Sequence, residues 1–362
     1  MVAASPHTAV LDVGIAARGL HGEAYRGHIF WDELFILPLY NLHFPDTAKA
    51  TLLYRYRRLD AARDYAREYG YEGAMFPWQS GSDGREETPV VHLNPNSGKW
   101  GPDYSSLQRH VSLAIPYGAW EYYHATQDRG FLQDYGAELF VELARFWASV
   151  STNNPVTGRY EIAGVMGPDE FHEKYPGAET GGIKDNSYTN IMVAWLLRTT
   201  AEVLELIGTE ARRSVAAATG LTDVEQKQWA EIASGLNLHA SAEGVLEQFD
   251  GYFGLEELDW EAYRQEYGAI GRMDRILKAE GKSPDDYKVA KQPDALMPFF
   301  VLPEGELGEI LSSLGYKAEP DLLKKNFDYY LPRTSHGSTL SRLVHADLAN
   351  RAGRLDLSWD LY

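Results

Sequence analysis

The amino-acid sequence predicts an all-α fold in a single domain spanning residues 1–362. Three observations lead to this prediction. Apolar residues recur at helical spacing over long segments, convincing strand alternation is scarce, and no change of composition marks a linker. Helix–loop–helix pairs carry the chemically interesting residues on alternate loops, which favours a toroid of paired helices with a site at one rim. A helical bundle would show the same periodicity, so that alternative stays open.

The expected helices follow one another along the whole chain. They span 29–41, 46–69, 105–126, 131–150, 190–207, 222–233, 273–280, 295–301, 304–314, 321–330 and 338–352. The segment 46–69 is polar and rich in Arg, which is typical of an outer helix, whereas 190–207 is apolar on most faces and is expected to be buried. Thr222 with Glu225 three residues later is the capping-box pattern of a helix start.

Two long segments are expected to be loops, 70–104 and 158–186, because Gly, Pro and Asp are frequent in both. Connections of this length in a compact domain are usually functional. The candidate site residues are therefore sought in these loops and at the neighbouring helix ends.

Composition excludes several classes of function. The formal net charge is 34 − 52 = −18, so nucleic acids and anionic membranes are not expected as partners, and an anionic substrate needs a local positive pocket. The absence of cysteine excludes disulfides, thiolate catalysis and Cys-based zinc sites. Residues 1–20 lack a signal-peptide pattern and no apolar run has transmembrane length, so we expect a cytoplasmic protein.

Recognised cofactor motifs are also missing. The 11 His residues are scattered without HExxH spacing, and there is no P-loop, GxGxxG or GxSxG motif. We therefore expect no metal and no nucleotide cofactor. The 23 Tyr and 9 Trp suit a sugar site, because flat pyranose faces pack on aromatic rings, although most individual aromatic residues are expected to be core residues.

Glu170, within the segment Gly167–His172, is the candidate general acid. Cleavage of an acetal needs a proton donated to the leaving oxygen by a carboxyl group that burial or a neighbouring negative charge keeps protonated. Asp169 and Glu173 are close in sequence and are candidates for that neighbouring charge. A solvated acidic loop is the alternative interpretation.

Two further segments offer sugar-binding groups. Asp32 can accept hydrogen bonds from two hydroxyl groups, and Phe30 or Trp31 can cover an apolar sugar face, although an Asp in the first turn of a helix is also ordinary. Lys291 and Gln292 offer a charged donor and an amide, a pairing that suits vicinal hydroxyls. Taken alone, this dipeptide is a weak signal.

The segment His336–Ser341 suits an anion. A potentially cationic imidazole and several hydroxyl groups precede an apolar helical run, and the free N–H groups of a helix N-terminus bind phosphate well. An ordinary Ser/Thr-rich helix cap with a structural His336 is an equally weighted alternative. With the preceding segments, the set suits cleavage of a glycosidic bond by phosphate.

The sequence resembles glycoside hydrolase family 65, the inverting phosphorylases of α-linked glucose disaccharides such as maltose, trehalose, kojibiose and nigerose. The match runs in the family's order over most of the chain. Its motifs are AARGLHGEAYRGHIFWDELFILP, EGAMFPWQS, GPDEFHE, DNSYTN, KQPDALMPFF and PRTSHGSTLSRLVHA.

This resemblance implies an (α/α)6 barrel, with Glu170 as general acid and inorganic phosphate as co-substrate in place of a cofactor. It assigns contacts with the glucosyl unit to Trp31, Asp32, Lys291 and Gln292, and phosphate binding to His336, Ser338 and Thr339. Trp78 and Gln79 would lie near the acceptor sugar. Phosphate would attack the anomeric carbon directly, giving β-glucose 1-phosphate and a free acceptor by a single inversion.

The sequence also departs from the family pattern. The β-sandwich that usually precedes the barrel and the small sheet domain that follows it are expected to be absent, and Gln79 stands where many members have Glu. An inverting, trehalase-like hydrolase of the same fold therefore remains an alternative; it requires a second carboxylate, for which Asp294 and Glu304 are the candidates. A truncated, inactive sugar-binding domain is the other alternative. The sequence leaves the disaccharide linkage open, and a homodimer also remains open.

Overall fold

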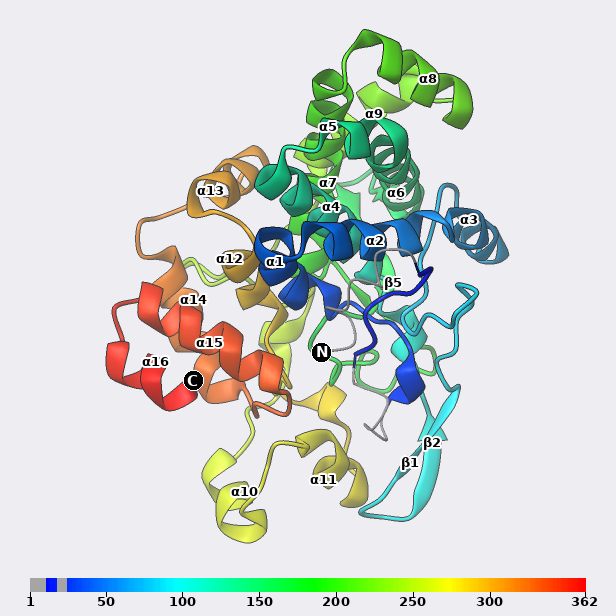
Figure 1. Ribbon diagram of the computed structural model, residues 1–362. Helices are drawn as coiled ribbons and strands as arrows, with labels where there is room; N and C mark the ends of the chain where they lie inside the picture. Colours follow the sequence, from blue (N-terminus) through cyan, green and yellow to red (C-terminus); the bar gives the residue numbers. More distant parts are fainter. Residues whose placement is uncertain (1–10, 18–24) are drawn as a thin grey trace. The chain divides into compact units, whose positions relative to one another are not determined.

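The structure is a computed structural model that describes residues 11–17 and 25–362. It is predominantly helical, as predicted, and its strands are short (Figure 1). Within the described part of the chain, no helix combines the length and the apolar character needed to cross a membrane.

The chain folds into two compact units, each assembled from three separate segments. Unit 1 comprises Met1–Thr88, Arg109–Thr152 and Val193–Ala233, and unit 2 comprises Pro89–Gln108, Asn153–Met192 and Ser234–Tyr362. The expectation of one domain over residues 1–362 stays a prediction.

Unit 1 is built almost entirely from helices. Its elements are η3 Tyr25–Gly27, α1 Glu33–His43, α2 Pro45–Tyr56, α3 Leu59–Glu68, α4 Val111–Thr126, α5 Arg129–Phe131, the π-helical turn η5 Leu132–Gly136, α6 Ala137–Val150, α8 Thr209–Thr219, α9 Asp223–Gly235 and most of α7 Ser187–Leu206. Helices α1, α2 and α4 pack on one another. The capping box predicted at Thr222 is confirmed, because its hydroxyl accepts the Glu225 N–H at 3.2 Å and the Glu225 carboxylate accepts the Thr222 N–H at 3.0 Å.

Unit 2 combines shorter helices with small strand pairs. Its helices are η4 Ser105–Leu107, η6 Tyr252–Gly254, α10 Trp260–Tyr267, α11 Met273–Ala279, η7 Pro284–Asp286, η8 Asp294–Leu296, α12 Met297–Val301, α13 Glu304–Ser313, α14 Leu322–Tyr330, η9 Leu331–Arg333, α15 Thr339–Arg351 and α16 Leu355–Leu361. Strand β1 Val91–Asn94 pairs with β2 Lys99–Pro102, β3 Thr152–Asn153 with β4 Tyr160–Glu161, and β5 Ala163–Val165 with β6 Ile183–Lys184. Helices α14, α15 and α16 lie side by side (Figure 1).

The predicted helix 46–69 is wrong, because the chain forms two helices there, α2 and α3. Arg58, between them, is buried, and its guanidinium donates hydrogen bonds to the carbonyl oxygens of Tyr54 and Ser82. The side chain thus satisfies a carbonyl at the end of α2 that a continuous helix would have paired with a backbone N–H. Sequence periodicity does not reveal that a side chain takes the place of a backbone N–H as the partner of this carbonyl.

Other boundaries also differ from the prediction. Helix α1 begins at Glu33 rather than at residue 29, and α4 begins at Val111 after a short 3-10 turn. Helices α8, α10 and α16 were not predicted, because at most one residue in each is buried and no apolar stripe marks them. The expected loops 70–104 and 158–186 contain the β1–β2 hairpin and the short strands β4, β5 and β6.

The core of each unit fixes a segment that carries candidate site residues. In unit 1, Gly73 passes so close to α6 that an added Cβ would overlap the Glu142 carbonyl oxygen, which accepts the Ala74 N–H at 3.0 Å. This contact anchors the chain that leads to Trp78. In unit 2, Phe171 is buried in an apolar cluster with Met273 and Val289, which holds the residue next to Glu170. Burial of a Phe side chain stabilises the folded state by about 1.5–3 kcal/mol.

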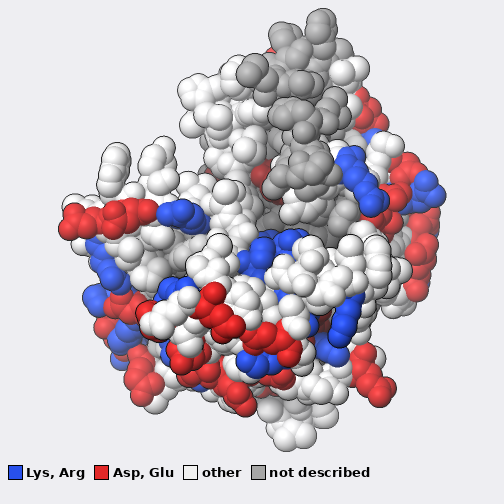
Figure 2. Space-filling model, turned by 90° about the horizontal axis from the view of Figure 1, so that it is seen from below, with Lys and Arg blue, Asp and Glu red and all other residues white. Residues whose placement is uncertain are grey.

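The surface is charged but mixed. Figure 2 shows acidic and basic side chains interspersed over one face of the protein. Several charged side chains of unit 2 are paired, such as Arg333 with Glu257 at 2.8 Å and Lys288 with Glu257 at 3.1 Å. Exposed pairs of this kind contribute about 0–1 kcal/mol each, so they affect solubility more than stability.

Candidate active site

The predicted acid lies in unit 2 on the irregular segment between β5 and β6. Glu170 has a φ of 66°, a left-handed conformation that costs a residue other than Gly roughly 1–3 kcal/mol. Its side chain is 29% exposed, and its Oε2 accepts a hydrogen bond from Lys291 Nζ at 2.7 Å. The carboxyl group is therefore accessible and in direct contact with a predicted sugar-binding residue.

Lys291 and Gln292, the predicted glucosyl contacts in unit 2, lie beside the segment that carries Glu170. The Lys291 N–H donates to Asp169 Oδ1 at 2.8 Å, and the Gln292 amide donates to the Pro168 carbonyl oxygen at 2.8 Å. The Gln292 Oε1 atom is buried and has no hydrogen-bond partner among residues 11–17 and 25–362. A buried acceptor left open in this way suits a hydroxyl group of a ligand.

The candidate phosphate loop packs against the same lysine. Ser335 donates its N–H to the Ala290 carbonyl oxygen at 2.8 Å, so the loop runs beside the chain that enters Lys291. A Cβ added at Gly337 would lie 3.1 Å from Lys291 Cγ and would overlap the Gly271 carbonyl oxygen. Lys291 therefore contacts the acid at its ammonium group and the anion loop along its stem.

The phosphate candidates themselves are uncharged donors. Burial, with a further contribution from Arg342, lowers the pKa of His336 to about 4, and His336 Nδ1 lies 3.1 Å from the Ser341 hydroxyl. The imidazole is thus neutral at pH 7 in this structure, although the sequence suggested a potential cation. Ser338 caps α15 by accepting the Leu340 N–H at 3.2 Å, and Thr339 is the exposed first residue of that helix.

The remaining predicted residues lie in unit 1, where three of them form an aromatic cluster. Phe30 contacts Trp78 edge-on at 5.1 Å, and both Trp78 and Trp31 contact His110, at 5.0 and 4.5 Å between ring centroids. The three predicted aromatic side chains are at most 6% exposed. His110, which no sequence motif singled out, joins them.

Asp32 and Gln79 carry the polar groups of this cluster. Asp32 is the N-cap residue of α1 and is half-buried. Gln79 Oε1 lies 3.2 Å from His28 Nδ1, and the Glu86 carboxylate accepts the N–H groups of Trp78 and Gln79 at 2.8 and 3.0 Å. Glu86 thereby fixes the backbone of both predicted acceptor-side residues.

Comparison with known proteins places the chain in a family. The sequence model described as "Glycosyl hydrolase family 65 central catalytic domain" matches residues 1–362. The chain belongs to glycosyl hydrolase family 65. The resemblance noted in the sequence is therefore confirmed, and the helical fold agrees with it.

Relatives of this family 65 chain include named phosphorylases. It is 46% identical over 350 residues to the trehalose 6-phosphate phosphorylase of Lactococcus lactis and 35% identical over 357 residues to the kojibiose phosphorylase of Halothermothrix orenii, covering 97% and 95% of this chain. An uncharacterized glycosyl hydrolase of Mycobacterium tuberculosis is 51% identical over 350 residues, which is 97% of this chain. The solved structure of a putative kojibiose phosphorylase from human microbiome matches 97% of this chain with a TM-score of 0.79 and 26% identity.

The chain spans less than half the length of these proteins. It covers 44% of the Lactococcus protein, 42% of the Halothermothrix protein, 26% of the Mycobacterium protein and 46% of the solved structure.

Sequence reasoning did not single out several buried polar side chains close to Glu170 in the fold. His172 lies beside Asp169 with 2.5 Å between Nδ1 and Oδ2, and the buried amides of Gln248 and Asn186 donate to Asp169 and Asp294 respectively. The Asp-x-x-His spacing within GPDEFH could have indicated the pair, because both side chains can meet across one turn. Gln248 lies far along the chain and carries no local signal.

Asp169 and Glu173 were suggested as charges that keep Glu170 protonated. In the structure, the carboxylates of both residues bind groups other than Glu170. The Asp169 carboxylate accepts hydrogen bonds from His172, Gln248 and the Lys291 N–H, and the Glu173 carboxylate pairs with Lys278 Nζ at 3.0 Å.

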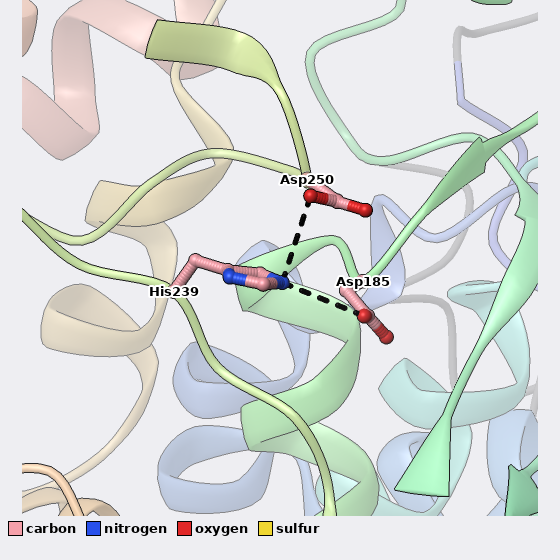
Figure 3. A group of neighbouring side chains, drawn as sticks. All are labelled: Asp185, His239 and Asp250. Carbon is pink, nitrogen blue, oxygen red and sulfur yellow. Dashed lines mark ion pairs between the residues drawn. The ribbon is translucent and has the colours of Figure 1, made fainter. Parts of the chain in front are cut away.

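One group of side chains in unit 2 has the composition of a metal site. Ligand atoms of Asp185, His239 and Asp250 lie within 4.8 Å of one another (Figure 3). Cationic and amide donors already occupy these carboxylates, since Lys184 Nζ lies 3.5 Å from Asp250 and Asn237 donates to Asp185 at 2.8 Å. We therefore interpret the group as a hydrogen-bonded charge network and propose no metal there.

Glu173 predicts a measurable pH dependence of stability. Burial, opposed by Lys278, raises the pKa of Glu173 to about 7, above the ordinary value of 4.5. The folded state therefore binds this proton more tightly than the unfolded state, so its contribution is present below pH 4.5 and is lost as pH rises through 7. Replacing Glu173 by Gln should reduce the fall in unfolding free energy between pH 5 and pH 8 by about 1–3 kcal/mol, measured by urea titration.

The exposed Glu256, changed to Gln, is the matched control and should leave the pH profile of the unmodified protein unchanged. An E173Q profile parallel to that of the unmodified protein would contradict the assignment.

Proposed function

We propose that this chain catalyses the phosphorolysis of an α-linked glucose disaccharide with inversion. Glu170 donates a proton to the bridging oxygen, and inorganic phosphate attacks the anomeric carbon from the opposite face. The bond from that carbon to the acceptor oxygen breaks, a bond to a phosphate oxygen forms, and the proton leaves with the acceptor. The products are β-glucose 1-phosphate and a free acceptor sugar, with no further cofactor.

One observation carries the proposal: Lys291 joins the acid to the anion loop. Its Nζ lies 2.7 Å from Glu170, and its stem lies against Gly337, the residue between the phosphate candidates His336 and Ser338. An inverting phosphorolysis requires a proton donor and an anion site on either side of one anomeric carbon. The phosphorylase names of the relatives support the same reaction.

Lys291 also couples sugar binding to proton donation in this proposal. Without substrate, its ammonium group pairs with the Glu170 carboxylate. Hydroxyl groups of a bound glucosyl unit compete for Nζ, and the open Gln292 Oε1 accepts another hydroxyl. Binding of the glucosyl unit would thereby release the Glu170 carboxyl group from its ion pair with Lys291 and leave it free to face the bridging oxygen.

The residues predicted in unit 1 are also proposed as sugar contacts. Phe30, Trp31 and Trp78 supply aromatic surface, Asp32 accepts hydroxyl groups, and Gln79 meets the acceptor sugar. The support is their cluster around His110 and the rigid backbone that Glu86 gives Trp78 and Gln79. We also propose the (α/α)6 barrel as the arrangement of the helices, on the support of family membership and the helical content.

The hydrolase alternative finds less support. Asp294, one candidate for the second carboxylate, is fully buried and accepts hydrogen bonds from the Asp169 N–H at 2.5 Å and the Asn186 amide at 2.6 Å. Glu304, the other candidate, is an exposed residue at the start of α13. A carboxyl group that activates water needs solvent access and a free acceptor oxygen, and Asp294 lacks the first.

A product assay tests the function. The protein is incubated with trehalose 6-phosphate, trehalose, maltose, kojibiose or nigerose, with and without inorganic phosphate, and β-glucose 1-phosphate is followed by ³¹P NMR. We expect phosphate-dependent product, with trehalose 6-phosphate tested first because of the 46% identity to the Lactococcus enzyme. Glucose release without phosphate would establish the hydrolase, and no turnover under any condition would favour a non-enzymatic sugar-binding domain.

A further inference from the structure

A buried Asp–His pair lies directly behind the acid. Asp169 and His172 are 1% and 2% exposed, and Asp169 Oδ2 lies 2.5 Å from His172 Nδ1. The other ring nitrogen, Nε2, lies 2.9 Å from the Tyr287 carbonyl oxygen, which can only accept. Both ring nitrogens thus face acceptors, so the geometry is that of an imidazolium paired with a carboxylate.

The charges around the pair are consistent with this state. Burial opposes a charged imidazole, but the Asp169 carboxylate, the Tyr287 carbonyl and Asp285 together raise the pKa of His172. Burial and the charge of Asp169 raise the pKa of Asp294 well above its ordinary value, which favours the neutral form of Asp294. Apart from Asp285, the groups facing His172 from the neighbouring turn are the Phe249 and Tyr252 rings, which carry no charge at neutral pH.

The Asp169 carboxylate links the segment that carries Glu170 to the segment that carries Lys291. Its Oδ1 accepts the Lys291 N–H at 2.8 Å, and the Lys291 ammonium group returns to Glu170, the residue that follows Asp169 in sequence. The Asp169 N–H donates a hydrogen bond to Asp294 Oδ1 at 2.5 Å. Backbone, carboxylate and ammonium group therefore form a closed ring that includes the left-handed Glu170.

We propose that Asp169 and His172 are positioning residues that hold Glu170 and Lys291 in the geometry required for proton donation. The inference rests on the proposed function. The left-handed backbone of Glu170 is strained, so it persists only where surrounding contacts determine it, and the ring supplies those contacts. Loss of the carboxylate or of its imidazole partner allows the acid to shift, and a displacement of about 1 Å can reduce the rate by about 100-fold.

The test compares kcat and KM of four variants in the phosphorolysis assay. Asp169→Asn should lower kcat by about 100-fold and change the disaccharide KM by less than about threefold, since sugar contacts remain. His172→Gln keeps an N–H donor for Asp169 and should retain about tenfold more kcat than His172→Leu, which has none. His239→Gln, a substitution in the separate Asp185 network, is the matched control and should keep the unmodified kcat.

The assay distinguishes failure of the proposed function from failure of this inference. An unmodified protein that forms no glucose 1-phosphate overturns the proposed function and this inference with it. An active protein whose D169N variant keeps kcat within about threefold overturns the inference alone. If D169N does not fold, as judged by thermal melting, the comparison of His172→Gln with His172→Leu tests the inference instead. Equal kcat values for these two variants at equal melting temperature would show that the Asp169–His172 pair only stabilises the fold.

Discussion

Replacing Glu170 by Gln is expected to lower kcat for phosphorolysis by about 100- to 10,000-fold, the range that a positioned general acid contributes. Gln has nearly the same shape and can still accept a hydrogen bond from Lys291, but it has no proton to donate. Disaccharide binding should therefore persist, and isothermal titration with the unreacted substrate should give a Kd within about threefold of the unmodified value.

A change of leaving group separates loss of the acid from loss of structure. α-Glucosyl fluoride releases fluoride without needing a proton, so the E170Q variant should convert it and phosphate to β-glucose 1-phosphate at a rate near that of the unmodified protein. Glu173→Gln is the matched control, because Glu173 lies in the same loop but pairs with Lys278. Unchanged disaccharide turnover in E170Q would show that another group donates the proton.

The helical elements with wide apolar stripes could be predicted from sequence, and those held by side-chain contacts could not. The segment 131–150 was predicted as one helix, and its second part is α6, in which Leu139, Leu143 and Phe146 recur at helical spacing and are fully buried. The π-helical turn η5 that precedes α6 was not predicted. The break between α2 and α3 depends on where the Arg58 guanidinium finds carbonyl partners, which only the folded structure determines. The β1–β2 hairpin was missed because Gly and Pro dominate the segment around it.

The candidate site also contains residues that sequence motifs predicted and residues that they did not. Glu170, Lys291 and Gln292 were predicted from motifs, and the structure brings them together within one unit. The contact of His172 with Asp169 was not predicted, although the Asp-x-x-His spacing was available in the sequence, because the interpretation of this segment centred on Glu170. Asp294 and Glu304 were named for the hydrolase alternative from residue type, neither being expected to be well placed, and the structure buries Asp294 in hydrogen bonds with Asp169 and Asn186. Burial is a property of the fold, so residue type could not reveal it.

Gly337→Ala is expected to raise the KM for phosphate and to lower kcat/KM for phosphate by about 100-fold. The added Cβ would overlap the Gly271 carbonyl oxygen, a backbone atom that cannot rotate away, and would press on Lys291 Cγ at 3.1 Å. The loop must therefore shift between His336 and Ser338, while the fold of α15 and the sugar contacts other than Lys291 remain. Disaccharide binding, measured by titration in the absence of phosphate, should therefore weaken much less than phosphate binding.

Gly308→Ala is the matched control, because a Cβ there meets nothing within 4 Å and the residue lies in the middle of helix α13. It should leave both KM values unchanged and stabilise the protein by roughly 0.5–1 kcal/mol, as Ala does relative to Gly in a helix. If G337A folds and keeps its phosphate KM within about threefold, the loop around His336 does not bind the nucleophile, and the anion must be held elsewhere in the site. If phosphate KM rises while α-glucosyl fluoride binding is retained, the defect lies in the anion loop itself, because the same variant still recognises the glucosyl unit.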